Sequence, residues 1–129
     1  MGKMIQYPNI TPLAERRFRL NETVHIQLKS GVWTITAPWI YDGASIPRPV
    51  WSLVGLYPGG VMEEPALWHD SFYRAAGVQN GIHMLTRHKA DLIFRQMMRE
   101  YSIPMIRAQI AYIAVYTCGR RHWGGPSPY

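Results

Sequence analysis

The chain has 129 residues, of which 47% are hydrophobic and 17% charged, and its formal net charge is +6 at pH 7. This composition excludes an intrinsically disordered chain, and the length predicts a single domain (1–129) with a core of its own. The lone cysteine, Cys118, excludes an internal disulfide framework and the usual cysteine-rich zinc sites.

The N-terminal third is predicted to form a small antiparallel β-meander. Residues 1–14 contain two prolines and no apolar run, so we expect a surface lead-in and no signal peptide. Within 15–37, apolar and polar residues alternate over 24–28, which is the period of a strand with one buried face. We expect the three strands of this meander at 17–20, 24–28 and 32–37, with a two-residue turn at 30–31.

Residues 38–62 are rich in proline and glycine, which predicts an irregular loop region. Asp42 can be a turn residue that bonds its own backbone. Alternatively, Asp42 and the backbone around Gly43 supply oxygen ligands to a cation shared with Asp70. Hard cations such as calcium prefer such carboxylate and carbonyl oxygens.

The helical core is predicted at 63–118, followed by a loose tail at 119–129 that Trp123 pins down. Its first helix begins at Pro65 and is closed by Gly77, and the second takes Thr86 as its N-cap. Because their connection is short, these two helices should be antiparallel. The third helix, 104–118, is apolar around nearly its whole circumference, so we expect it to be the most buried, although its apolar run is too short to span a bilayer. The predicted fold class is α+β.

His69 and Asp91 are predicted to face each other across the first two helices. Each lies roughly 8 to 12 Å along its helix from their connection, at about 1.5 Å per residue. A carboxylate in this position holds the imidazole in one tautomer and stabilises its charged form. Tyr73 shares a helix face with His69, whereas Asp70 lies on the adjacent row and is available to a metal.

Other chemistries fit the sequence less well. Eleven of the fourteen basic residues are arginine, but they are dispersed and accompany no nucleic-acid-binding motif, so nucleic acid is not the expected partner. The serines lack a Gly-x-Ser-x-Gly elbow, and His83 and His88 do not give a familiar zinc spacing with His69. The structural alternative is a buried bond between His69 and Asp91 that joins two helices without any turnover.

Three ordered motifs carry a resemblance to a known family. They are Tyr-Asp-Gly-Ala-Ser-Ile-Pro-Arg at 41–48, His-Asp-Ser-Phe-Tyr-Arg at 69–74 and Arg-His-Lys-Ala-Asp-Leu-Ile-Phe at 87–94. Together they resemble a phage and prophage family known as domain of unknown function 1353, over nearly the whole chain from Phe18 to Trp123. The resemblance implies a phage or prophage origin, and hence a location in the infected host cytoplasm or in the virion.

The last two motifs also resemble the catalytic helix pair of phospholipase A₂, particularly its prokaryotic form. This resemblance implies that His69 is the general base that activates water, that Asp91 orients it and that Tyr73 buttresses the pair. It also implies that Asp70 binds calcium, with Asp42 and Gly43 standing where that family has its calcium loop.

Two functional hypotheses follow from these observations. One is a calcium-dependent esterase acting on phospholipid or another ester of the cell envelope. The other is a non-catalytic phage protein, either a virion or tail component or a binder of a host factor, that keeps the helix pair as a scaffold. An apolar rim around a cleft at His69 would favour the esterase, and a cleft filled by Trp68 or Tyr41 would favour the scaffold.

Overall fold

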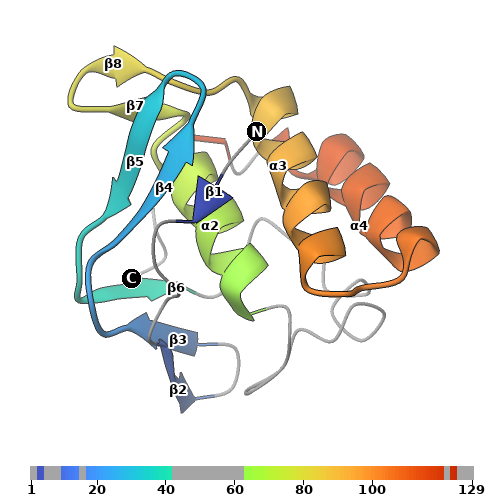
Figure 1. Cartoon of the computed structure of the whole chain (residues 1–129), viewed down its shortest axis with the longest axis horizontal. Coiled ribbons are helices and arrows are strands. Elements are labelled where there is room, and N and C mark those ends of the chain that lie inside the picture. Colours follow the sequence, from blue (N-terminus) through green and yellow to red (C-terminus); the bar gives the residue numbers. More distant parts are fainter. Residues whose placement is uncertain (1–2, 5–9, 15–16, 42–62, 121–122, 125–129) are drawn as a thin grey trace.

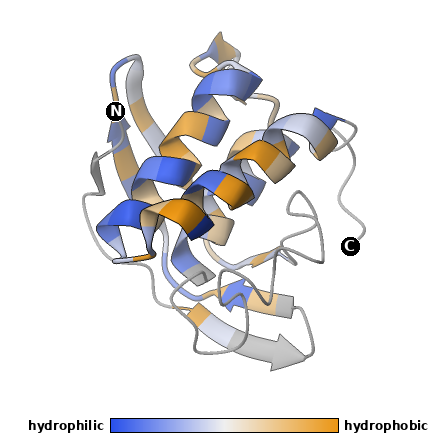
Figure 2. Cartoon of the chain, turned by 90° about the vertical axis from the view of Figure 1, so that its right-hand side faces the viewer, coloured by the Kyte–Doolittle hydropathy of each residue, from blue (hydrophilic) through white to orange (hydrophobic). Residues whose placement is uncertain are grey.

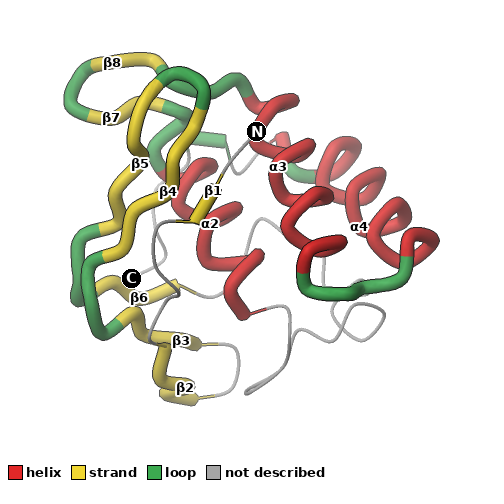
Figure 3. Tube along the Cα trace, in the orientation of Figure 1, coloured by secondary structure: helices red, strands yellow, loops and turns green. Residues whose placement is uncertain are grey.

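The structure is a computed structural model that describes residues 3–4, 10–14, 17–41, 63–120 and 123–124 (Figure 1). Its strands are β1 (Lys3–Met4), β2 (Ile10–Ala14), β3 (Arg17–Leu20), β4 (Val24–Leu28), β5 (Gly31–Ile35), β6 (Trp39–Tyr41), β7 (Val78–Gln79) and β8 (Ile82–His83). The helices within these ranges are α2 (Glu63–Arg74), α3 (Arg87–Glu100) and α4 (Met105–Cys118). The predicted α+β class, with antiparallel strands preceding three helices, is confirmed (Figure 3).

The N-terminal strands are antiparallel as predicted, but they form two small sheets and not one continuous meander. One sheet has the order β1-β4-β5 and the other β2-β3-β6, while β7 and β8 make a separate hairpin. Strand β3 pairs with β6, where Leu20 lies opposite Trp39. It lies in a different sheet from β4, the next strand along the chain. Phe18 stacks on Tyr41 with ring centroids 5.2 Å apart, and this buried aromatic pair favours β6 as the partner.

Three local predictions also need correction. The lead-in contributes β1 and β2, and Pro12 is tolerated because β2 is an edge strand that need not donate on its outer side. The loop region begins with β6, and its remainder, 42–62, lies outside the described residues. The hairpin turn is Lys29-Ser30, because Leu28 pairs with Gly31, whose φ of +136° favours glycine.

Helix α2 is the centre of the described structure. All its residues from 65 to 73 are buried, because one face meets β5 through Trp33 and the other meets α3. On the sheet side, the Trp33 ring lies edge-on to Phe72 at 5.1 Å, and its Nε1 donates to Ser71 Oγ at 2.9 Å. These contacts fix α2 against the sheet and leave the row of His69 and Tyr73 facing the helical side.

The connection between α2 and α3 is as short as predicted, and the two helices run antiparallel (Figure 1). Gly77 has a φ of +72°, and a Cβ added there would lie 1.9 Å from the Leu85 carbonyl oxygen. Only glycine allows this crossing, in which Met84 N donates to Gly77 O at 2.7 Å. Thr86 then caps α3 by accepting from Lys89 N, which confirms the predicted N-cap.

Helix α4 is the outermost helix, and the prediction that it is the most buried was wrong. Only Ala108, Ala111 and Val115 of this helix are buried, whereas Ile106 is 71% exposed. The reason is its position, because α4 packs mainly along α3 and no other described helix or strand covers its outer face. No helix in the described ranges is both long and apolar enough to cross a membrane.

Candidate functional site

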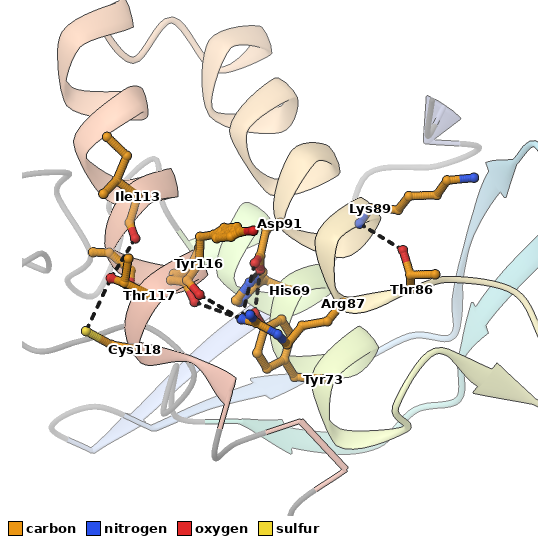
Figure 4. A network of polar contacts seen from close by, with 12 residues as sticks. His69, Tyr73, Thr86, Arg87, Lys89, Asp91, Ile113, Tyr116, Thr117 and Cys118 are labelled. Carbon is orange, nitrogen blue, oxygen red and sulfur yellow. Dashed lines mark hydrogen bonds and ion pairs between the residues drawn. The ribbon is translucent and has the colours of Figure 1, made fainter.

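The predicted bond between the first two helices is present. His69 Nε2 lies 2.9 Å from Asp91 Oδ1, and both side chains are completely buried (Figure 4). An ionised carboxylate can only accept, so the imidazole donates from Nε2 and its neutral form carries the basic lone pair on Nδ1. The His69 ring is held between Tyr73 and Phe94, with ring centroids 4.3 and 4.5 Å away.

Tyr73 contacts the carboxylate directly. Its hydroxyl donates to the same Asp91 Oδ1 at 2.5 Å. Tyr73 was predicted to support the His69–Asp91 pair, and it does so by a direct hydrogen bond to the carboxylate. Burial removes the phenolate from water, and the neighbouring carboxylate repels it, so the pKa of Tyr73 is raised well above its usual value. Tyr73 is therefore a permanent donor at neutral pH and holds Asp91 in place.

Arg87 completes the network and was not predicted. Its Nη1 lies 3.6 Å from Asp91 Oδ2 and donates to the Tyr116 carbonyl of α4 at 3.0 Å, so one guanidinium joins α3 to α4. The signal was available in the sequence, because Arg87 and Asp91 are four residues apart on one helix. Among the described residues no donor forms a hydrogen bond with Asp91 Oδ2, so the ion pair with Arg87 is its main stabilisation there.

The C-terminal segment covers this network from the side of Tyr73. Trp123 lies edge-on to the Tyr73 ring at 5.1 Å, and Gly124 N donates to Tyr73 O at 2.7 Å. Gly119 packs so closely that an added Cβ would lie 3.0 Å from the Tyr73 hydroxyl. Residues 119 and 123–124 are thus packed and not loose, and Trp123 pins them as predicted.

The predicted metal ligands are only partly within the described structure. Asp70 is buried on α2, with 5% of its surface exposed, whereas Asp42 and Gly43 lie outside the described residues. Among the described residues, no group of three histidine, cysteine or acidic side chains is placed to hold a metal ion. Because Asp42 and Gly43 lie outside the described residues, the predicted calcium site stays a prediction.

The arrangement can orient a general base. Asp91 is held by Tyr73 and Arg87, and its Oδ1 accepts the hydrogen bond from His69 Nε2 that orients the imidazole. Such a carboxylate stabilises the imidazolium that forms when a histidine removes a proton from water.

A comparison with known families identifies the chain. Residues 18–115 match the family described as "Protein of unknown function (DUF1353)". The chain belongs to this family. The match spans both helices of the His69–Asp91 pair, which agrees with the resemblance carried by the sequence motifs. No curated protein and no solved structure matched the chain.

Membership of the DUF1353 family does not assign an activity to the site. The phospholipase-like roles of His69, Asp91 and Tyr73 stay predictions, although the residues themselves lie together. The same holds for calcium binding by Asp70.

Proposed function

We propose that this DUF1353 protein is a hydrolase that cleaves an ester of phospholipid or of another cell-envelope component. The observation that carries the proposal is the hydrogen bond of 2.9 Å between His69 Nε2 and an Asp91 carboxylate that Tyr73 also holds. A carboxylate with several donors is positioned in advance, and advance positioning is what a general-base site requires. A phage or prophage origin, with action in the host cytoplasm or in the virion, is part of the proposal and rests on the sequence resemblance.

The reaction requires one base and one water molecule. His69 Nδ1 removes a proton from water as the water oxygen attacks the ester carbonyl carbon, and Asp91 stabilises the imidazolium. When the tetrahedral intermediate collapses, the bond to the alkoxyl oxygen breaks and the imidazolium returns the proton to that oxygen. The products are an alcohol and a carboxylic acid, which ionises in water.

The test is the substitution Asp91→Asn, read by fatty-acid release from phospholipid vesicles and by thermal unfolding of the same preparation. Loss of tautomer and charge support should lower hydrolysis by about 10⁴-fold and leave the fold nearly intact. His83→Gln, at an exposed histidine of β8, is the matched control and should retain full activity. A parent protein without activity on vesicles and on a soluble ester contradicts the proposal.

A second function is favoured by a different observation. His69 and Asp91 are both 0% exposed, and Trp68 and Tyr41 are fully buried as well, which is the condition expected of a scaffold. On this hypothesis the chain is a non-catalytic virion or tail protein, or a binder of a host factor. Asp91→Asn would then cost about 1–3 kcal/mol of unfolding free energy, with no hydrolysis to lose.

We also propose that Asp70 binds calcium, because a buried carboxylate is a suitable ligand for a hard cation. Calcium would bind only the folded state, so it should raise the melting temperature. At a free calcium concentration of a hundred times Kd, the free energy of unfolding should increase by about 2.7 kcal/mol. Asp70→Asn should abolish that rise and leave the calcium-free protein as stable as the parent. If Asp70 is a structural ion-pair partner, the substitution destabilises the protein with or without calcium and the ion shifts nothing. Calorimetry with a calcium titration of both proteins distinguishes the two results.

A further inference from the structure

The outward face of α4 is an apolar stripe. Ile106, Ile110 and Ile113 are 71%, 44% and 49% exposed, and their spacing of four and three residues places them on one side of the helix. Figure 2 looks onto the side where α4 lies in Figure 1, and hydrophobic segments recur along the helices there. Three adjacent isoleucines on the most solvent-exposed line of a helix are costly in water, so this stripe calls for a partner.

Aromatic rings and arginines form one border of the stripe. Arg95 of α3 lies over the Tyr112 ring at 4.6 Å and donates to Gln109 at 3.1 Å. One helical turn further, the Arg87 guanidinium lies 5.5 Å from the Tyr116 ring. Tyrosines beside arginines next to an apolar surface are the composition found where a protein meets the headgroup region of a bilayer.

The charged residues on and next to α4 are mainly basic. Helix α4 contains no acidic residue, and Arg107 and Arg120 are exposed on it and just beyond its end. On α3, the two acidic residues are Asp91, which is buried in the network, and Glu100, which is exposed at the end of the helix. The whole chain has a net charge of +6. The apolar stripe therefore lies within a surface that is mainly basic.

We propose that the α4 stripe is a docking surface for a membrane rich in anionic lipid. The isoleucines would insert at the boundary between headgroups and acyl chains, while the arginines would contact lipid phosphate, as in helices that lie in the membrane interface. A second copy of this chain is less favourable, because two basic faces would be brought together. Nucleic acid does not fit either, because isoleucines offer no planar surface on which bases can stack.

This inference goes beyond the proposed hydrolysis and does not depend on it. If the hydrolysis is correct, membrane binding by α4 would bring the protein to its lipid substrate. The α4 surface is linked to the site, since Arg87 contacts both Asp91 and the Tyr116 carbonyl. Vesicle binding can be measured whether or not lipid is cleaved, so failure of one proposal is distinguishable from failure of the other.

The test is sedimentation of the whole chain with vesicles of phosphatidylcholine alone, or of phosphatidylcholine and phosphatidylglycerol in equal parts. The parent should bind the mixed vesicles, bind phosphatidylcholine weakly and lose affinity as salt is added. Ile110→Glu should reduce the partition coefficient by at least about tenfold, because it replaces the proposed apolar contact with lipid by a charge that anionic lipid repels. Ile82→Glu is the matched control, because Ile82 is 62% exposed but lies on β8, and it should bind like the parent.

Several results would overturn the inference. They are a parent that does not bind mixed vesicles, equal binding to both vesicle types, or equal losses for Ile110→Glu and Ile82→Glu. Sedimentation equilibrium without lipid addresses the second copy. A dimer of the parent that Ile110→Glu dissociates, together with an absence of vesicle binding, would assign the stripe to self-association.

Discussion

Helices α2 and α4 invert the usual relation between polarity and burial. Helix α2 buries four side chains with polar groups: His69, Asp70, Ser71 and Tyr73, whose hydroxyl is bonded to Asp91. Helix α4 is the more apolar of the two and exposes most of its large side chains. The difference lies in position, because α2 has a sheet on one side and α3 on the other, whereas α4 rests on α3.

This comparison shows what a hydrophobic pattern can and cannot indicate. A helix that is apolar all round is expected to be buried, yet burial also requires neighbouring elements on every side. Polar side chains on α2 are tolerated because each of the bonds to Trp33 and Asp91 satisfies a buried group. Exposed apolar residues on α4 receive no such compensation within the described structure, which is why they point to an external partner.

The largest expected difference between the two helices comes from matched deletions in each. Leu67→Ala on α2 and Ile106→Ala on α4 remove the same number of carbon atoms. Leu67 is fully buried, so its loss should cost about 2–5 kcal/mol, including the cavity it leaves. Ile106 is 71% exposed, and its loss should change stability by no more than about 0.5 kcal/mol. Urea unfolding measures both, and comparable losses would mean that α4 is covered in solution.

A smaller effect should appear in alkaline solution. Tyr73 keeps its proton in the folded state because its pKa is raised, whereas an unfolded tyrosine ionises near pH 10. Unfolding then releases a proton, so this group makes stability fall as pH rises above about 10, by at most about 1.4 kcal/mol per pH unit. Tyr73→Phe should lose the hydrogen bond to Asp91 at neutral pH but show a shallower alkaline decline. Equal slopes for parent and variant in alkaline denaturation would show that Tyr73 is not held as a donor.

The sequence predicted local structure and the central pair well, because both depend on short-range patterns. Alternation located β4, the N-cap Thr86 located α3, and helix rise placed His69 opposite Asp91. The division into two sheets was not predictable, because β3 pairs with β6 across the intervening hairpin. The exposure of α4 was not predictable for the same reason, since it depends on which elements pack against the helix in the folded chain.

The metal ligands mark a further limit of prediction from sequence. Asp70 is placed by the helix that carries it, whereas Asp42 and Gly43 belong to an aperiodic stretch whose placement depends on the rest of the fold. The role of Arg87 was missed for a different reason. Its spacing from Asp91 was visible, but its bond to the Tyr116 carbonyl depends on where α4 packs.

The smallest expected effect is a polar substitution on the α4 stripe, Ile110→Gln. Ile110 is 44% exposed, so the change buries no new polar group in the free protein. Glutamine also has a higher helix propensity than the β-branched isoleucine, by a few tenths of a kcal/mol. The free energy of unfolding should therefore stay within about 0.5 kcal/mol of the parent, on the stabilising side if the propensity dominates.

The same change at Leu67 on α2 provides the contrast, because an amide without partners in a filled core should prevent stable folding. A loss above about 1 kcal/mol for Ile110→Gln in urea unfolding would show that the stripe is already covered by the chain itself, and the membrane would then lose its docking surface.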